Sequence, residues 1–152
     1  MIVDLAHASP AAFAETLAIA TRPVVISHGG VKATCNTTRN LSDDQLRALA
    51  VNGGVIGIGY WDAAVCKATP AATAAAIKHV RDLVGIQYVG LGSDFDGGTT
   101  TGFDTAELAA VTQALLDAGF SDAEIAAVMG GNVIRVVRAG WSPRPPIREP
   151  AF

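Results

Sequence analysis

Four short runs of mostly apolar, β-branched residues recur along the chain, with helix-compatible stretches between them. The runs lack a strict alternation of apolar and polar positions, which is typical of parallel strands covered on both faces. The predicted strands span Ile2–Ala6, Val24–Ser27, Val55–Gly59 and Tyr88–Gly92. Their alternation with helices predicts an α/β fold with a parallel sheet and right-handed crossovers.

Start and stop signals place the helices between these strands. Ser42 with Gln45 and Ser121 with Glu124 match the pattern of a capping box, and Gly85 follows a helical stretch as a stop signal. A Ser-Pro and a Thr-Pro pair, each a cap followed by a first-turn proline, open two other helices. The predicted helical stretches are 11–20, 46–49, 71–83, 105–118, 121–129 and 133–137.

This order of elements fits two architectures. One is a doubly wound sheet, and the other is a section of a (β/α)8 barrel, whose usual length is about 250 residues. No GxGxxG or phosphate-binding loop follows the first predicted strand, which weighs against a nucleotide-binding doubly wound fold. We expect one domain over residues 1–141 and a proline-rich tail over 142–152 that does not continue a helix.

Composition excludes several classes of protein. Half of the 152 residues are hydrophobic and 16% are charged, which is not the composition of a disordered chain. A net charge of −3 gives no basic surface for nucleic acid, and no apolar run approaches the ~20 residues of a membrane span. The first residues lack the features of a signal peptide, so we expect a cytoplasmic location. Because the chain opens directly on a strand, we also expect that an N-terminal segment is missing.

Candidate chemistry lies where the predicted strands end. His7 follows the first strand, His28 the second, and Asp94 the fourth. The carboxyl ends of parallel strands line the ligand crevice in α/β folds, and imidazole with carboxylate is a ligand set of zinc in hydrolases. A single histidine after a strand is more often a hydrogen-bonded loop residue, but the coincidence at several strand ends favours a metal site. Asp94 is the better candidate for ligand or base, whereas Asp96 is expected to shape the turn.

Four further residues could carry chemistry. Arg39 is either a solvated loop residue or a clamp for a substrate carboxylate. His79 lies in the middle of a helix and is expected at the surface. Cys35 and Cys66 have no CxxC spacing, so they are either small buried residues or, in an oxidising compartment, a disulfide.

Several segments together resemble the membrane dipeptidase family of zinc peptidases. Order and spacing agree over nearly the whole chain except the tail. The segments are Ile2–Ser9, Pro23–His28, Thr38–Asp44, Gly90–Gly97 and Met129–Asn132. The resemblance implies strands five to eight of an amidohydrolase-like (β/α)8 barrel, and a binuclear zinc centre that hydrolyses dipeptides.

The resemblance also implies roles for particular residues. His7 and His28 would be the metal ligands at the ends of strands five and six. Arg39 would bind the terminal carboxylate of the substrate, and Asp94 would be the acid/base near the bridging water. Tyr60, with the adjacent tryptophan, would border the substrate pocket, although core packing explains it equally well.

The remaining implication concerns the two cysteines. Cys35 and Cys66 fall where animal members carry a pair that can form a disulfide. The resemblance therefore implies that the two cysteines are close in space, without implying that they are oxidised.

The chain departs from the family pattern in its metal ligands. Neither a His-x-Asp pair nor the glutamate that bridges the two metals is found, and Gly29-Gly30 stands where many members have serine. Three interpretations follow. The chain is a truncated dipeptidase, one subunit of a split barrel completed by an N-terminal half, or a non-catalytic half-barrel module that forms a homodimer.

Overall fold

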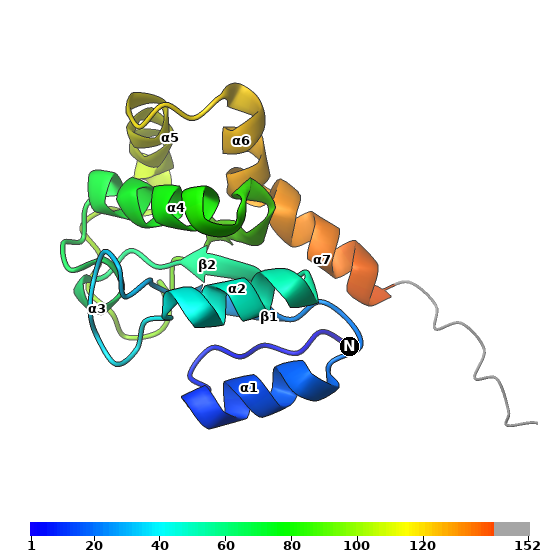
Figure 1. Ribbon diagram of the computed structural model, residues 1–152. Coiled ribbons are helices and arrows are strands. Elements are labelled where there is room, and N and C mark those ends of the chain that lie inside the picture. The colour runs from blue at the N-terminus through cyan, green and yellow to red at the C-terminus, as the bar shows by residue number, and fades with distance from the viewer. Residues whose placement is uncertain (142–152) are drawn as a thin grey trace, which may run out of the picture.

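The computed structural model describes residues 1–141 and has a three-stranded parallel sheet at its centre (Figure 1). The strands are β1 (Val25–Gly29), β2 (Val55–Ile58) and β3 (Val89–Leu91), in the order β1-β2-β3. Ile56 in the middle strand pairs with Ile26 on one side and Val89 on the other. The α/β fold, the parallel pairing and three of the four predicted strands are thus confirmed.

The strand predicted at Ile2–Ala6 was wrong. This segment runs beside β1 but makes only an isolated parallel bridge between Asp4 and Val25. The Leu5 N–H donates to the Val25 carbonyl at 2.8 Å, and the pairing then stops. It stops because the Asp4 carboxylate accepts the Ser27 N–H at 3.0 Å, and a continued ladder would offer that N–H to the Leu5 carbonyl.

The helices begin largely where the caps predict. The Ser9 hydroxyl accepts the Ala12 N–H at the start of the first helix, and both predicted capping boxes are formed. The helices are α1 (Pro10–Ile19), α2 (Asp43–Asn52), α3 (Asp62–Val65), α4 (Pro70–Val84), α5 (Leu108–Asp117), α6 (Asp122–Ala126) and α7 (Asn132–Trp141). Short turns η1 (Ile86–Tyr88), η2 (Thr105–Glu107) and η3 (Ala127–Gly131) complete the elements. No helix within residues 1–141 has both the length and the apolar composition of a membrane span.

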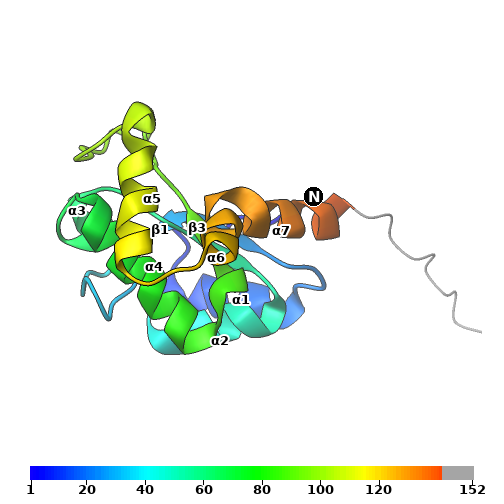
Figure 2. The same ribbon diagram turned by 90° about the horizontal axis from the view of Figure 1, so that it is seen from above.

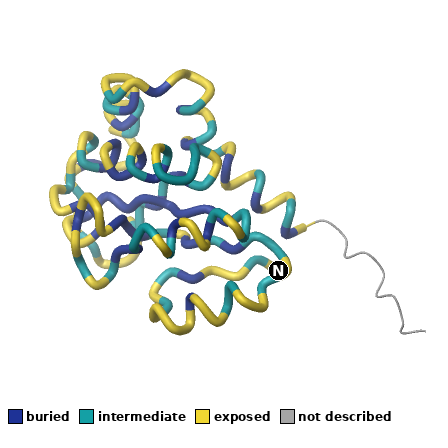
Figure 3. The backbone as a smooth tube through the Cα atoms, in the orientation of Figure 1, coloured by how far each residue is buried: buried dark blue, intermediate teal, exposed yellow. Residues whose placement is uncertain are grey.

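The two faces of the sheet differ. Figure 2 shows α1, α2 and α4 on one side of the strands, and Figure 3 shows the buried residues concentrated along the strands and the helices that face them. Ile56 and Ile58 are fully buried on the side of α4, where Ile77 and Val80 are also fully buried. The opposite face carries small residues: a Cβ on Gly57 would lie 2.3 Å from the Ser27 carbonyl oxygen. Most of the core therefore lies on the helical side, while Val55 and Val133 meet beside Gly90 on the opposite face.

Helix α7 is longer than the short stretch predicted and ties together the amino ends of the strands. Arg135 donates through Nη1 to the Gly53 carbonyl at 2.7 Å, just before β2. Asn132 donates through Nδ2 to the carbonyls of Ile86 (2.7 Å) and Val89 (2.8 Å) at β3. Gly130, with φ 156°, makes the break from which α7 starts. The carboxyl ends of the strands are consequently left as the open, polar end of the sheet.

We expect Ile56→Ala to lower the free energy of unfolding by about 3 kcal/mol, because it removes a fully buried side chain from the central strand. Chemical denaturation monitored by circular dichroism measures this change. Val51→Ala is the control, since Val51 is 91% exposed and its change should stay within about 0.5 kcal/mol. Equal effects of the two substitutions would contradict the assigned core.

Candidate functional site

The carboxyl end of the sheet brings His7, His28 and Asp94 together from three separate segments. The two Nε2 atoms of His7 and His28 lie 2.9 Å apart. The Asp94 Oδ2 lies 3.8 Å from His28 Nε2, and the side chains of His28 and Asp94 are only 17% and 14% exposed. The convergence expected from the strand-end positions is therefore present. His7, however, follows an extended segment rather than a strand.

Two of these residues have an unusual backbone. His7 has φ 65° and Asp94 has φ 56°, and within residues 1–141 Cys66 is the third non-glycine residue with positive φ. Such conformations cost free energy, and they occur most often at functional positions. At Asp94 the turn is held by hydrogen bonds from the Gly97 N–H and the Thr99 hydroxyl to the Asp94 carbonyl, both at 3.0 Å. The left-handed residues reverse the chain so that both side chains stay at the sheet end.

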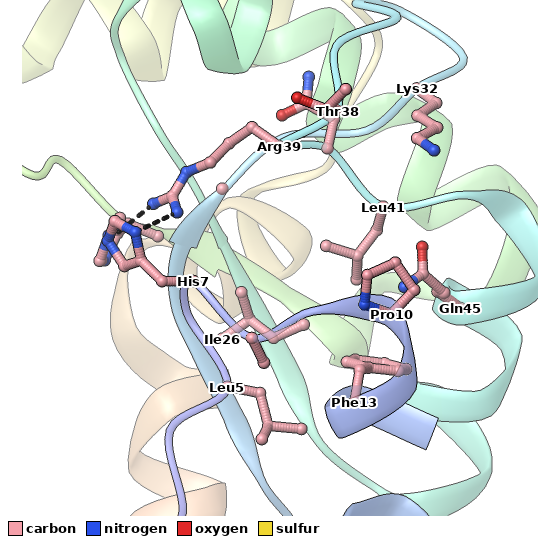
Figure 4. Close-up of a pocket in the computed structure, with 14 residues that line it drawn as sticks. Leu5, His7, Pro10, Phe13, Ile26, Lys32, Thr38, Arg39, Leu41 and Gln45 are labelled. Atoms are coloured by element: carbon pink, nitrogen blue, oxygen red, sulfur yellow. Dashed lines mark hydrogen bonds between the residues drawn. The ribbon is translucent and has the colours of Figure 1, made fainter. Parts of the chain in front are cut away.

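Arg39 reaches this cluster from the loop after β1. Figure 4 shows its guanidinium pointing at His7, with Nη1 2.6 Å from Nδ1 and Nη2 3.1 Å from Nε2. Its Cζ also lies 5.9 Å from the centre of the Trp61 ring. The adjacent Asn40 is buried and donates through Nδ2 to the carbonyls of Cys35 (2.7 Å) and Ala64 (2.9 Å). Arg39 is thus partly buried and held over the sheet end by these contacts.

A disulfide between Cys35 and Cys66 further fixes this loop. It joins the loop that carries Arg39 to the end of α3, with Cα atoms 5.3 Å apart. Cys35 is 1% exposed, and the described residues contain no free cysteine. The closeness implied by the resemblance is confirmed, and of the two alternatives left by the spacing the structure has the disulfide.

Tyr60 and Trp61 follow β2 at the same end of the sheet. Tyr60 is 2% exposed, and its ring centre lies 4.8 Å from that of Phe103 and 5.7 Å from that of Phe95. Burial raises the pKa of the Tyr60 phenol to about 12. The Trp61 ring centre lies 6.0 Å from that of His28. Trp61 therefore forms part of the wall beside the histidines, whereas Tyr60 is mainly a packed aromatic residue.

Hollows of different character adjoin the cluster. One, of about 280 Å³, is lined by His7 and Arg39, by Lys32, and by apolar side chains including Leu5 and Phe13 (Figure 4). A more open hollow of about 450 Å³ lies along His28, Asp94 and Asp96. A third, of about 300 Å³, is bordered by Tyr60, Ser93, Phe95, Thr105, Leu108 and Met129. The first two hollows both open onto His28.

The histidine pair has the spacing of two ligands on one ion. Two nitrogens bound to the same tetrahedral zinc at 2.0–2.1 Å lie about 3.3 Å apart, close to the observed 2.9 Å. Within residues 1–141, however, no group of three or more His, Cys, Asp and Glu side chains is arranged to hold a metal ion. His79 does not contribute: it is half-buried and pairs with Asp43 through Nε2 at 2.8 Å, between α4 and α2. The described residues fit part of a metal site.

Sequence reasoning missed two polar residues beneath the cluster, Asp4 and Ser27. Ser27 Oγ lies 2.9 Å from His28 Nδ1, and Asp4 accepts the Ser27 N–H. Their position in the sequence could have revealed them, since a polar residue in an otherwise apolar predicted strand needs a hydrogen-bond partner.

Imidazole and carboxylate side chains at the carboxyl ends of a parallel sheet are the arrangement of metal-dependent hydrolases of the α/β class. Comparison with known proteins is more specific. The model of the membrane dipeptidase family, peptidase family M19, matches residues 1–142. The chain belongs to this family.

A sequence relative is Dipeptidase aclJ of Aspergillus oryzae, which is 39% identical over 145 residues. The match covers 90% of this chain but 34% of aclJ, so the chain spans about a third of that relative's length.

Solved structures share the fold. An amidohydrolase from Pseudomonas aeruginosa is 27% identical, with a TM-score of 0.82 over 93% of this chain and 53% of its own. A metallopeptidase from Rhodobacter sphaeroides, liganded with a phosphinate mimic of the dipeptide L-Ala-D-Ala, has a TM-score of 0.83 at 24% identity. That match covers 91% of this chain and 42% of the metallopeptidase. The chain therefore reproduces about half of a larger fold.

Reducing the disulfide should lower the free energy of unfolding by about 3–4 kcal/mol, because the bond closes a long loop between residues with a sequence separation of 31. Denaturation with and without reductant measures the change. A Cys35→Ala, Cys66→Ala double variant should show the same loss and no response to reductant. An unchanged stability on reduction would contradict a stabilising role for the bond.

Tyr60 should make stability depend on pH in alkali. Its pKa rises from 10.0 to about 12 on folding, so the contribution is fully present below pH 10 and is lost as the pH rises towards 12. Absorbance titration and denaturation across this range measure both effects. Tyr60→Phe should abolish the titration near pH 12 and flatten the slope, whereas Tyr88→Phe should leave both in place.

Proposed function

We propose that residues 1–141 form the C-terminal half of a (β/α)8-barrel metallodipeptidase, contributing its strands five to eight and their helices. The observation that carries the proposal is the meeting of two imidazoles, with Nε2 atoms 2.9 Å apart, beside Asp94 at the carboxyl end of the sheet. The proposed reaction is hydrolysis of a dipeptide by a metal-activated water. The proline-rich tail over 142–152 lies outside the described residues.

The proposed metal is zinc, held in part by His7 and His28 through their Nε2 atoms. When bound, zinc lowers the pKa of a coordinated water and polarises the substrate carbonyl. A catalytic zinc normally has three protein ligands, and two imidazoles fall short of that number. The His-x-Asp pair and the bridging glutamate would come from the N-terminal half of the fold.

The other site residues have roles that follow from their places. Asp94 would take a proton from the attacking water at a carboxylate oxygen and pass it to the leaving amine, because it lies beside His28 and is largely shielded from solvent. Arg39 would bind the substrate carboxylate bidentately, since the structure holds its guanidinium over the cluster. Tyr60 would border the hollow that receives a substrate side chain.

The proposed partner is a complementary N-terminal half. Two observations support it. The sheet ends in an extended edge at one side and β3 at the other, and Val3, Phe95, Met129 and Val133 remain 37–42% exposed. The match to the Pseudomonas amidohydrolase, which covers 53% of that chain, leaves room for a partner of similar size.

A second candidate is a homodimer that acts as a non-catalytic half-barrel module. The same open edges favour it, because a second copy would also cover them. Such a dimer would bring four histidines and two copies of Asp94 to one end, but it would still lack the bridging glutamate. The two candidates therefore differ in activity as well as in composition.

The cytoplasmic location stays a prediction. Disulfides form and persist mainly in oxidising compartments, so the Cys35–Cys66 bond supports a location outside the cytoplasm. Thiol labelling of protein from the native host would show whether the bond is formed there, and so distinguish a location inside the cytoplasm from one outside it.

The decisive experiment mixes the full chain with the N-terminal half of a family member and measures dipeptide hydrolysis with added zinc. We expect activity from the mixture and none from either part alone. His28→Ala should reduce the activity by more than about 100-fold, because it removes a proposed ligand. His79→Ala, the same substitution outside the site, should leave the activity unchanged.

Other outcomes would count against the proposal. Hydrolysis by the isolated chain would contradict the incomplete site. A mixture that forms no complex, together with a stable dimer of this chain in analytical ultracentrifugation, would favour the half-barrel module. Zinc titration showing no binding by the mixture would remove the metal assignment.

A further inference from the structure

A line of hydrogen bonds runs beneath the histidine pair, from Asp4 to Arg39. The Asp4 carboxylate accepts the N–H groups of Ala6 (2.9 Å) and Ser27 (3.0 Å), and it also accepts a hydrogen bond from the Ser27 hydroxyl. Ser27 Oγ lies 2.9 Å from His28 Nδ1. Asp4, Val25 and Ser27 share the face of the sheet opposite the helices, because Asp4 pairs with Val25 and alternate residues of a strand point the same way.

The chemistry of the groups decides where each proton lies. A carboxylate can only accept, so the single proton of the Ser27 hydroxyl points to Asp4. The Ser27 oxygen is then an acceptor towards His28, and His28 must carry its proton on Nδ1. A neutral imidazole with Nδ1 protonated has its lone pair on Nε2. Nε2 of His28 is the atom that faces His7 and Asp94.

At the other end of the line, the Arg39 guanidinium faces both ring nitrogens of His7. Its Nη1 lies 2.6 Å from His7 Nδ1, and its Nη2 lies 3.1 Å from His7 Nε2. Arginine can only donate and a neutral imidazole accepts at one nitrogen only, so no single tautomer of His7 satisfies both contacts. The tautomer of His28 is therefore assigned from its contact with Ser27.

The acceptor at the end of the line is ionised. Burial of the Asp4 carboxyl raises its pKa, but hydrogen bonds from the Ser27 hydroxyl and from the N–H groups of Ala6 and Ser27 outweigh this and lower the pKa below its ordinary value. An ionised carboxylate is a stronger acceptor than a neutral one, and it cannot donate to Ser27.

We propose that Asp4 and Ser27 are positioning residues that hold His28 in the Nδ1-protonated tautomer and aim its Nε2 lone pair into the site. This rests on the proposed function only in that His28 is a metal ligand there. Hydrogen bonds to the second ring nitrogen are the usual means of orienting a metal-binding histidine. Asp4 has a second effect, because the same carboxylate ties the segment that carries His7 to the strand that carries His28.

The test reads the tautomer directly by ¹⁵N NMR of the histidine rings in the full-length, metal-free chain. The spectra are recorded at about pH 8. We expect His28 to be protonated at Nδ1, and Ser27→Ala to shift it to a mixture of tautomers. Ser27→Thr keeps the hydroxyl and should restore the wild-type spectrum. His79 serves as the internal reference, since it lies outside the line of hydrogen bonds.

Ser93→Ala is the matched control. It is the same substitution after β3, at the same end of the sheet, lines the same hollow as His28, and removes no hydrogen bond to His28. Asp4→Asn is a second variant that keeps an oxygen for the backbone N–H groups but removes the charge, so it should shift the His28 tautomer while the protein remains folded by circular dichroism. An unchanged His28 spectrum in Ser27→Ala and Asp4→Asn, or protonation at Nε2 in the wild type, would overturn the proposal.

Zinc titration of the complemented protein provides a second readout. Ser27→Ala should weaken zinc binding by about 10–100-fold, with Ser27→Thr restoring it and Ser93→Ala having no effect. Equal zinc affinity in the wild type and Ser27→Ala would overturn the positioning role. The NMR result does not depend on zinc, so a failure of the metal assignment is distinguishable from a failure of the tautomer assignment.

Discussion

The hydrogen bond from the Ser27 N–H to the Asp4 carboxylate determines how the first segment of the chain meets the sheet. It replaces the backbone bond that would have extended the ladder, so the segment leaves β1 after Leu5 and turns at His7. The turn needs a left-handed residue, and His7 has φ 65°. Without this side-chain acceptor the segment would continue as a strand, and the His7 ring would not be directed towards His28. A local competition between side chain and backbone thus sets the geometry of the imidazole pair.

The rest of the site depends on covalent and polar ties between loops. Arg39 lies on a loop that would otherwise have many conformations, and holding it over His7 requires that this entropy be lost in folding. The Cys35–Cys66 bond and the buried Asn40 amide fix the loop to α3 from both sides of the arginine. The helical face of the sheet supplies the rigid support, since the side chains of Ile56 and Ile58 are fully buried there. Rigidity thus comes from one face of the sheet and chemistry from its carboxyl end.

Sequence patterns predicted most of the fold because the deciding interactions are local. Apolar β-branched runs placed β1 to β3, and the Ser42 and Ser121 caps placed two helix starts. The predictions failed where a residue distant in sequence determines the local structure. The predicted first strand stops because Asp4 accepts the Ser27 N–H. Helix α7, which starts after the break at Gly130, is held by hydrogen bonds to the ends of β2 and β3. The same division holds for the site. The strand-end rule predicted the meeting of His7, His28 and Asp94, but nothing in the spacing revealed which polar group orients each ring.

The open sheet explains why this cluster differs from a finished metal site. In a closed barrel every strand has two neighbours, and ligands from several strand ends surround one ion. Here the extended segment and β3 are edges, so the imidazoles are approached by protein groups from one side only. Arg39, a cation, lies against His7. A positive charge close to the ring nitrogens is thus part of this half of the fold, balanced at the far end of the hydrogen-bond line by the Asp4 carboxylate. The cation at the ring nitrogens is therefore a side chain of this half of the fold itself, whereas the number of ligands depends on what closes the sheet.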